Sequence, residues 1–379
     1  MSKVEELLAK YNPNGVFQSD LREVSSIIRG KRVTKRDVKE RGDYPVISGG
    51  ESPMGYYDTF NRDANTITIA QYGAAGYVDF QKNKFWANDV CYSILPFESV
   101  DNKYLYYTLK SKQNFIYSIR NTDAVPFSLP INTLYSIQIP LPHIKVQEEI
   151  VKILDSFTNL IDALNEELSL RQKQFEYYRE KLLTFDDKSL LKPINEIGTL
   201  FRGNGLQKKD FVDEGVGCIH YGQIYTKLGF SLSKPLTYVT KETAKPLTKV
   251  RKGDLVIACT SENIEDVCKS VVWEGEEEIV TGGHACVLRH NENPRYIGYF
   301  FQTHQFFMQK KQYAYGAKVI DIKTEKLGEI LIPIPPLAIQ QSIVEKLDAF
   351  ESLISSLKEE IALRQKQYEY YREKLLTFD

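Results

Sequence analysis

A 17-residue segment that occurs twice in the chain constrains its fold more than any other feature. LRQKQFEYYREKLLTFD begins at residue 170 and again at residue 363, with Phe175 replaced by Tyr368 as the only difference. The match continues upstream, where IPLPHIKVQEEIVKILDSF aligns with IPIPPLAIQQSIVEKLDAF at the same offset of 193 residues. A repeat of about half the chain length predicts a tandem duplication.

Each copy of the repeat has the pattern of a long helix. Apolar residues recur at alternating steps of four and three, which is typical of a heptad seam, and the proline-bearing segments PLP and PIPP precede each run. From about residue 150 to 185, such a helix is about 54 Å long. Arg171 and Arg364 interrupt the seams, where they either fix the register or extend into solvent. The main seam residues are Ile150, Leu154, Phe157, Ile161, Leu164 and Leu168 in the first copy, and Ile343, Leu347, Phe350, Ile354, Leu357 and Ile361 in the second.

A weaker repeat opens each half of the chain. LREVSSIIRGKRVTKRDV and INEIGTLFRGNGLQKKDF both place Arg-Gly before a basic cluster. The segments that follow have little obvious identity, but both alternate short strand patterns, such as TITIA and GDLVIACTS, with helical patterns, such as KYLYYTLKSKQNFI and YIGYFFQTHQFFMQKKQ. We therefore predict an α/β (α+β) protein with two globular domains, at residues 1–138 and 187–331, and two long helices, at 139–186 and 332–379.

The composition favours a folded, cytoplasmic protein. The 379 residues are 42% apolar, no apolar run approaches the roughly 20 residues that span a bilayer, and the first residues, MSKVEELLAK, are charged. The five cysteines form no CxxC pair, which argues against a disulfide framework or a zinc site. We therefore expect no membrane association and no bound metal.

Catalytic motifs are absent from the sequence. It has no GxxxxGK[ST] loop, no GxGxxG after a strand and no HExxH helix, and its five histidines have no partner at metal or triad spacing. Asn12-Pro13-Asn14-Gly15 is interpreted as a turn. We expect neither catalytic residues nor a cofactor in this chain.

Basic residues interleaved with aromatic and small polar residues are the candidates for binding nucleic acid. The net charge of −1 does not decide the matter, because phosphate binding needs a positive face rather than a positive total. An ordinary solvated surface is the alternative. The predicted DNA-binding residues are Arg29, Lys31, Arg32, Lys35, Arg36 and Tyr72 in the first domain, and Arg202, Lys208, Lys209, Tyr225, Lys227, Ser261 and Lys318 in the second.

The whole layout resembles the specificity (S) subunit of Type I restriction-modification systems. The similar segments include YPVISGG, ITIAQYGAAGYVDF and FWANDVCY in the first half, and IHYGQIYTKLG and GDLVIACTSENIEDVCKSVVW in the second. The duplicated proline-bearing start of each helix, which leads to Gln147 and Gln340, is the most specific match. The resemblance implies two target-recognition domains, each followed by a conserved helix, with the two helices paired as an intramolecular antiparallel coiled coil about a pseudo-two-fold axis.

The resemblance also implies a function and partners. Each domain would read one half of a bipartite, asymmetric target in double-stranded DNA, while two adenine-methyltransferase (M) subunits and restriction (R) subunits dock on the chain. S-adenosylmethionine would bind to M, and ATP and magnesium to R, with no cofactor in this chain. Helices of fixed length would set a spacer of about six to ten base pairs, near one turn of DNA.

Three other interpretations remain open from the residues alone. The chain is a self-sufficient DNA methyltransferase or nuclease, a coiled-coil scaffold that joins two protein-binding domains without DNA, or a protein whose helices only dimerise it with another copy.

Overall fold

The computed structural model describes residues 2–123 and 125–378, and it divides into two compact units. Unit 1 combines the chain up to Asn165 with the segment from Glu359 onward, whereas unit 2 is Glu166–Lys358. Each unit therefore contains one globular part and pieces of both long helices. In the part of the chain described here, no helix is both long and apolar enough to traverse a bilayer.

Unit 1 contains head 1, the globular part from residue 17 to residue 141. Its strands are β1 (Phe17–Asp20), β2 (Ser25–Arg29), β3 (Tyr44–Ile47), β4 (Tyr56–Tyr57), β5 (Thr66–Ala70), β6 (Val78–Gln81), β7 (Trp86–Ala87), β8 (Cys91–Pro96) and β9 (Gln138–Leu141). Its helices are α2 (Leu21–Val24), α3 (Asn102–Ser111), α4 (Gln113–Ser118) and α5 (Ile131–Tyr135); α1 (Lys3–Tyr11) precedes the head, and α6 (Ile144–Leu182) follows it.

Unit 2 contains head 2, from residue 191 to residue 333. Its strands are β10 (Leu191–Pro193), β11 (Gly198–Arg202), β12 (Phe211–Val212), β13 (Val216–Ile219), β14 (Ser231–Leu232), β15 (Thr237–Val239), β16 (Thr248–Val250), β17 (Leu255–Ala258), β18 (Thr260–Ser261), β19 (Ser270–Trp273), β20 (Ile279–Thr281), β21 (Ala285–His290), β22 (Ile320–Asp321) and β23 (Leu331–Pro333). Its helices are η2 (Lys208–Asp210), α7 (Ile194–Ile197), α8 (Tyr221–Thr226), α9 (Lys241–Ala244), α10 (Pro294–Phe300), α11 (His304–Tyr313) and α12 (Thr324–Gly328); η1 (Lys188–Leu190) precedes the head, and α13 (Leu337–Leu376) follows it.

The two heads share one strand plan although their sequences differ. The sheet order β2-β8-β5-β6 in head 1 corresponds to β11-β21-β17-β19 in head 2. A second sheet contains one parallel pair in each head, β3 with β7 and β13 with β20. A two-stranded sheet joins the beginning and the end of each head, β1 with β9 and β10 with β23. The duplication therefore includes the heads as well as the long helices.

The apolar patterns TITIA and GDLVIACTS form strands, as the sequence predicts, and the structure places these strands inside the sheets rather than at their edges. Every residue of β5 and of β17 is buried, because each strand is hydrogen-bonded on both sides and packed within a hydrophobic core. The helical pattern YIGYFFQTHQFFMQKKQ, in contrast, is divided between α10 and α11. The Thr303 hydroxyl accepts a hydrogen bond from the Phe306 backbone amide (3.2 Å), so a second helix starts there.

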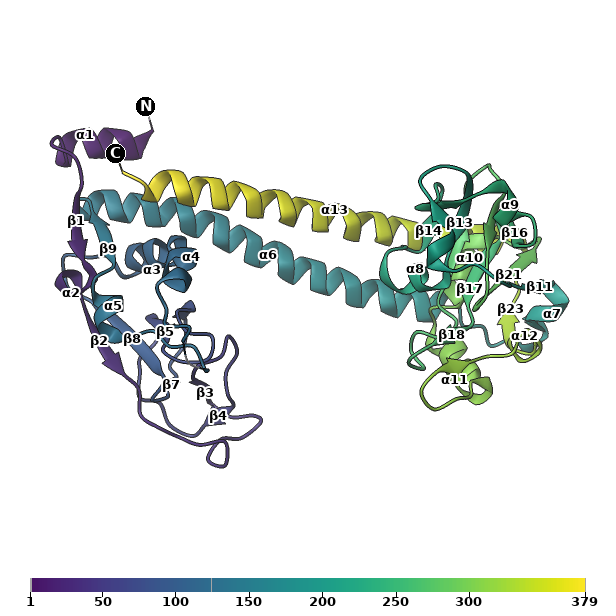
Figure 1. The fold of residues 1–379 in the computed structure, drawn as a ribbon, viewed down its shortest axis with the longest axis horizontal. Coiled ribbons are helices and arrows are strands. Elements are labelled where there is room, and N and C mark those ends of the chain that lie inside the picture. Colours follow the sequence, from purple (N-terminus) through teal and green to yellow (C-terminus); the bar gives the residue numbers. More distant parts are fainter. Residues whose placement is uncertain (1, 124, 379) are drawn as a thin grey trace. The chain divides into compact units, whose positions relative to one another are not determined.

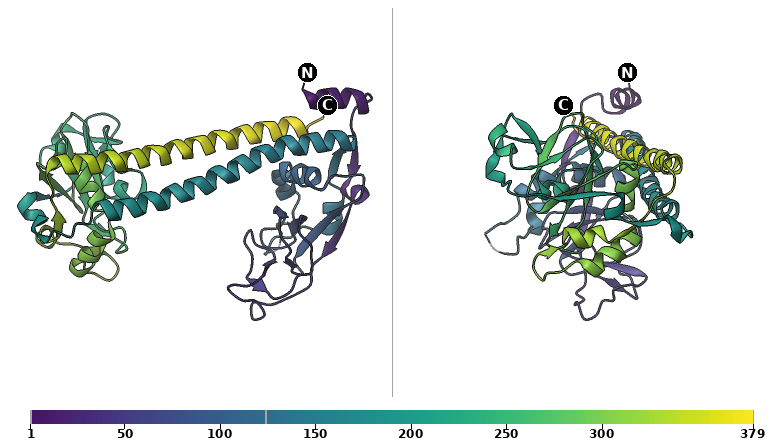
Figure 2. Two further views of the ribbon diagram at one scale, coloured as in Figure 1. Left: turned by 180° about the vertical axis from the view of Figure 1, so that it is seen from behind. Right: turned by 90° about the vertical axis from the view of Figure 1, so that its right-hand side faces the viewer.

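The two long helices pack antiparallel in both units (Figures 1 and 2). In unit 1, Phe157 of α6 stacks on Tyr371 of α13 with 5.3 Å between ring centroids; in unit 2, Tyr178 of α6 stacks on Phe350 of α13 at 5.5 Å. The residue numbers of each pair add to 528, as a constant antiparallel register requires. Phe157 of α6 and Phe350 of α13 occupy the same position of the repeat. Each unit therefore contains the same ring pair, with the roles of α6 and α13 exchanged. This exchange gives the helix pairing pseudo-two-fold symmetry. The prediction of an intramolecular antiparallel coiled coil is confirmed.

The seam residues differ in how deeply they are buried. Ile150 and Leu154 are fully buried in the core of unit 1, as is Leu347 in that of unit 2. The two arginines that interrupt the seams bond within their own helices, Arg364 to Glu360 (2.7 Å) and Arg171 to Glu167 (3.3 Å). The other predicted seam residues are buried or partly buried: Phe157, Ile161, Leu164, Leu168, Ile343, Phe350, Ile354, Leu357 and Ile361.

A buried glutamine joins each long helix to its head. Gln147 is fully buried; its Oε1 accepts a hydrogen bond from the Asp101 backbone amide (2.9 Å), and its Nε2 donates to the Pro142 carbonyl (2.8 Å). Gln340 repeats this arrangement with the Asn293 amide (3.0 Å) and the Pro335 carbonyl (2.8 Å). Each buried glutamine thus satisfies one buried backbone carbonyl and one partly buried backbone amide.

Replacing Gln147 by alanine should destabilise unit 1. The substitution leaves the partly buried Asp101 amide and the buried Pro142 carbonyl without their glutamine partner, and this loss should lower the free energy of unfolding by about 1 to 3 kcal/mol. Chemical denaturation measures the change. Gln172→Ala, at an exposed helix position, is the matched control and should change stability by less than about 0.5 kcal/mol. Equal effects of the two substitutions would contradict the role of Gln147.

Candidate nucleic-acid interface

The repeated Arg-Gly dipeptide ends the first strand of the main sheet in both heads. Arg29 ends β2 and Arg202 ends β11. The following glycine donates its amide to a carbonyl of the neighbouring strand region, Gly30 to Cys91 (3.1 Å) and Gly203 to Ala285 (2.9 Å). A Cβ at either glycine would overlap carbonyl oxygens of the adjacent segment, so only glycine lets the backbone approach this closely.

The basic loop that follows Arg29 is held from one side by a buried asparagine. Asn88 Oδ1 accepts a hydrogen bond from the Val33 amide (2.9 Å), and its Nδ2 donates to the Val33 carbonyl (3.3 Å). The Lys31 amide donates to the Ala87 carbonyl (2.9 Å), and the Lys31 carbonyl accepts from Trp86 Nε1 (2.7 Å). The backbone of this loop is thereby fixed to the head while its charged side chains extend outward.

Residues 29–43 carry seven basic and three acidic side chains, a net charge of +4. One of the acids, Asp37, is occupied within the loop, because the hydroxyl and amide of Thr34 donate to it (both 2.7 Å); these bonds hold the pKa of Asp37 below its usual value. Within residues 2–123 and 125–378, five exposed cations that follow Arg29 in this loop form no ion pair. They are Lys31, Arg32, Lys35, Arg36 and Arg41.

Arg29 and Tyr72 lie next to this loop. The Arg29 guanidinium donates to the side-chain carbonyl of Gln71, which adjoins Tyr72. Tyr72 is exposed and forms a backbone bridge with Ser128. The structure thus places Arg29 beside Gln71, next to Tyr72, at the ends of β2 and β5, and the other four predicted residues of head 1 on the loop that starts at the end of β2.

In head 2, Arg202 belongs to a polar network. Its guanidinium pairs with Asp321 (3.1 Å), and Asp321 accepts a hydrogen bond from the Thr260 hydroxyl (2.9 Å), which also lies 3.1 Å from His284 Nδ1. The Tyr225 hydroxyl donates to the Thr260 carbonyl, and burial raises the pKa of Tyr225. Contacts inside the head therefore already engage the side chains of Arg202 and Tyr225. The same network includes three residues that the sequence analysis did not select: Thr260, His284 and Asp321.

The other predicted residues of head 2 differ in exposure. Lys208 and Lys209 lie exposed on η2, Lys227 is exposed just after α8, and Lys318 is exposed before β22. Ser261, in contrast, is buried in β18. Ser261 is therefore not positioned to touch a macromolecule at the surface.

A basic segment of head 2 escaped the sequence prediction. Residues 240–252 carry five basic side chains and one acidic one, a net charge of +4, whereas residues 202–214 are neutral. Ala244 and Leu247 of this segment pack with Leu206 in one hydrophobic cluster, so Lys241 and Lys245 lie near the loop that carries Lys208. The positive charge of the run KETAKPLTKVRK is visible in the sequence. The sequence does not show that this run packs beside the Arg-Gly loop.

Comparison with known proteins identifies the architecture. The family model described as Type I restriction modification DNA specificity domain matches the chain twice, at residues 13–170 and 191–363. The chain belongs to this family. Each match contains one head and the greater part of the long helix that follows it, in agreement with the duplicated strand plan.

Members of the Type I specificity family are similar over most of the chain. A putative type I restriction enzyme specificity subunit of Haemophilus influenzae is 29% identical, covering 94% of each chain. The EcoR124I/EcoR124II specificity subunit of Escherichia coli is 30% identical over 73% of this chain and 70% of its own. The crystal structure of the S subunit from M. genitalium shares the fold with a TM-score of 0.65 at 17% identity, covering 96% of each chain.

Replacing Asn88 by alanine should release the basic loop of head 1. Loss of both hydrogen bonds to Val33 leaves buried backbone groups unpaired, so amide hydrogens of residues 31–36 should exchange faster and the head should lose about 1 to 3 kcal/mol of stability. Hydrogen exchange with mass spectrometry measures the first effect. Asn83→Ala, at an exposed position, is the control. Unchanged exchange in the loop of Asn88→Ala would show that other contacts hold it.

Proposed function

We propose that this chain is the DNA specificity subunit of a Type I restriction-modification complex, and that each head reads one half of a two-part target in double-stranded DNA. The observation that carries the proposal is the twofold match to the specificity domain, since each match includes a head with an exposed basic segment. Exposed lysines and arginines without carboxylate partners are suited to phosphate contacts. The residues proposed for DNA are the predicted set without the buried Ser261, extended by Lys241 and Lys245.

The two heads should read different sequences. Their strand plans correspond, but the basic segment follows the Arg-Gly dipeptide directly in head 1, whereas in head 2 it spans α9 and β16. Side chains that reach base edges would therefore differ in identity and in position between the heads. An asymmetric target follows from two such surfaces.

The chemistry is assigned to partner subunits. Among the described residues, no group of three or more histidine, cysteine, aspartate or glutamate side chains could hold a metal ion. We propose that the M subunits bind S-adenosylmethionine and methylate adenine, and that R subunits bind ATP and magnesium. The present chain would supply position and sequence selection only, without catalytic residues.

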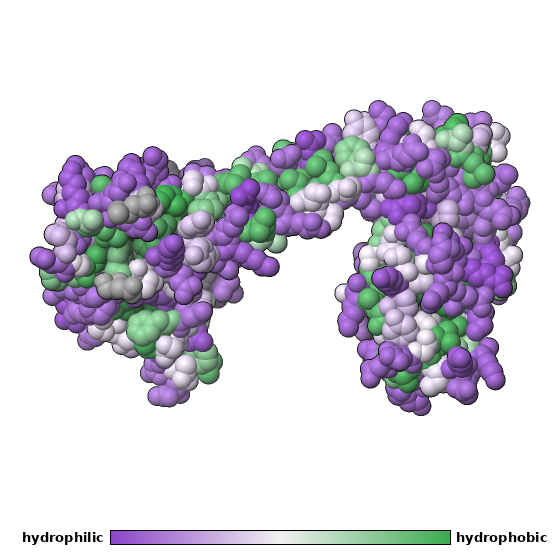
Figure 3. Space-filling view, turned by 90° about the horizontal axis from the view of Figure 1, so that it is seen from above, coloured by the Kyte–Doolittle hydropathy of each residue, from purple (hydrophilic) through white to green (hydrophobic). Residues whose placement is uncertain are grey.

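The long helices offer equivalent surfaces to two copies of one partner. Leu170 is 58% exposed and its counterpart Leu363 is 50% exposed; Tyr177 and Tyr370 are 59% and 60% exposed. Figure 3 shows apolar side chains at the surface of the helices. Single exposed apolar residues are common, but here both copies of the repeat keep them at matching positions. We propose that one M subunit docks on each set.

Expression of the chain with its M subunit tests the proposed function. DNA of the host should acquire methylated adenines in a single two-part motif with a fixed spacer, because both heads must engage together. Sequencing of modified bases measures motif and spacer at once. Modification without any motif would contradict the proposal.

The alternative functions give different results. Methyl transfer from S-adenosylmethionine by the purified chain alone would support a self-sufficient methyltransferase. DNA binding by the complex with M that does not weaken as salt is raised would favour a protein scaffold, because phosphate contacts release counterions.

Charged substitutions on the long helices should reduce the number of bound M subunits. Leu170→Asp or Leu363→Asp alone should leave about one M subunit bound, and the double variant none, because a buried unpaired carboxylate opposes docking. Native mass spectrometry of the complex gives the stoichiometry. Leu236→Asp, at a 53% exposed position in head 2, is the control and should retain both M subunits. Two M subunits on the double variant would exclude this surface.

A further inference from the structure

A second polar cluster ties each head to its long helix, beside the buried glutamine. We call these clusters anchor 1 and anchor 2. Counterparts within the long helices are 193 residues apart, and those on the head helices α3 and α10 are 192 apart, so the two anchors are copies of one device. Anchor 1 consists of Lys103, Tyr107, Asp155 and Thr158, and anchor 2 consists of Arg295, Tyr299, Asp348 and Glu351.

Anchor 1 contains one cation and one carboxylate. Lys103 Nζ lies 2.6 Å from Asp155 of α6, and the Tyr107 hydroxyl donates to the same carboxylate (2.7 Å) and lies 3.3 Å from the Thr158 hydroxyl. A cavity of about 430 Å³ opens beside these four side chains. Lys82, at the end of β6, adds an exposed ion pair with Asp162 of α6 (3.0 Å). Head 1 is therefore tied to its helix by two lysines.

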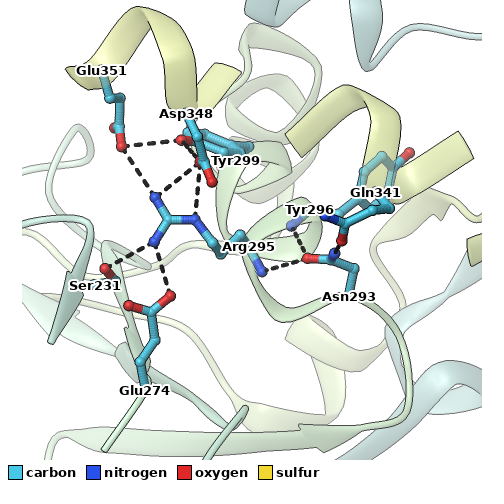
Figure 4. Close-up of polar contacts among 9 residues, drawn as sticks. All are labelled: Ser231, Glu274, Asn293, Arg295, Tyr296, Tyr299, Gln341, Asp348 and Glu351. Carbon is cyan, nitrogen blue, oxygen red and sulfur yellow. Dashed lines mark hydrogen bonds and ion pairs between the residues drawn. The ribbon is translucent and has the colours of Figure 1, made fainter. Parts of the chain in front are cut away.

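Anchor 2 gathers several carboxylates around one guanidinium (Figure 4). Arg295 lies 2.9 Å from Asp348 and 3.5 Å from Glu351, both on α13, and the Tyr299 hydroxyl donates to the same two carboxylates (2.6 and 3.0 Å). On the head side, Arg295 pairs with Glu274 (2.8 Å) at the end of β19.

Two further contacts complete anchor 2. Arg295 donates to the Ser231 hydroxyl of β14 (3.1 Å), and its guanidinium lies over the ring of Phe230. Phe230 in turn stacks on Tyr299 with 4.2 Å between ring centroids. One guanidinium thus contacts the edge of the head 2 sheet and α13 at the same time.

The chemistry of the two cations gives the anchors different stiffness. A guanidinium is a planar fork whose several donors fix its orientation, whereas an ammonium is a point charge on a flexible stem that keeps its ion pair through a range of angles. The exposed pair between Lys82 and Asp162 adds little restraint, because water and salt screen it.

We propose that the two anchors set how far each head turns on its long helix, and that head 1, held by lysines, has the wider range of orientations. This inference rests on the proposed function, because its consequence concerns a two-part DNA target. The protein engages both half-sites only when both heads are aligned, so the slower methylation of DNA whose spacer differs from the fixed cognate one should depend mainly on the turning of head 1. The residues of the anchors are positioning residues and do not touch DNA.

The complex with M provides the test. Initial rates of methyl transfer are measured on DNA with the cognate spacer and with spacers one base pair shorter and longer, together with melting temperatures. Arg295→Lys loosens anchor 2 and should raise the rate on altered spacers relative to the cognate one by about two- to fivefold, because lysine keeps the charge but loses part of the partly exposed ion-pair network. Lys103→Arg combined with Thr158→Glu gives head 1 the guanidinium and second long-helix carboxylate of anchor 2, and should lower that ratio by a similar factor.

Two ion pairs inside the heads supply matched controls. Lys84→Arg alters a pair with Asp63 (3.7 Å) in head 1, and Lys326→Arg alters a pair with Glu329 (2.8 Å) in head 2. Both pairs lie outside the basic segments proposed for DNA. Neither of these two substitutions should change the spacer ratio, and half-site bases should stay the same in every anchor variant. Ratios that stay unchanged in both anchor variants, or half-site preferences that change, would overturn the inference. Failure of the proposed function is separately visible, because the wild-type complex would then methylate no two-part target.

Discussion

The antiparallel contact between α6 and α13 is the constraint on which the rest of the structure depends, because each unit is assembled from segments that are distant in sequence. In unit 1, the stack of Phe157 on Tyr371 joins the first part of the chain to its last helical turns. Tyr368 and Leu376 then complete the core that also contains Tyr104 of head 1. Burial of large rings supplies much of the stabilisation, and the repeat supplies the same rings to unit 2.

Polar contacts add a defined orientation to this apolar packing. Apolar surfaces tolerate sliding and rotation, whereas a buried glutamine with both ends bonded to backbone groups is satisfied in one geometry only. Gln147 and Gln340 therefore fix the position of each head relative to the first turns of the long helix that follows it. The neighbouring tyrosines reinforce this joint, since Tyr104 donates to the Pro140 carbonyl and Tyr296 to the Pro333 carbonyl.

A shared framework with different surfaces is suited to modular recognition. The strand plan of the heads persists because each sheet must bury its central strands, β5 and β17. Exposed loops carry no such requirement, and their side chains change at little cost in stability. The basic loop after Arg29 and the basic segment near Lys241 thus occupy different places on one framework. The long helices differ from the loops, because both copies keep the same exposed leucines. Equal surface residues at matching positions are suited to binding two copies of one partner.

The sequence by itself determined the duplication, the two long helices and their seams, and the Arg-Gly starts of the heads, because these depend on local periodicity and on identity between copies. It did not reveal that DNKYLYY and NPRYIGY are copies of one joint, since only two of their seven residues are identical. Tertiary structure decided that match, because Lys103 and Arg295 are defined by carboxylates about 50 residues away in the chain. It also packed the segment that carries Lys241 against the loop that carries Lys208, and it buried Ser261. Contacts between distant segments depend on how the sheets and helices pack, and no local pattern encodes that packing.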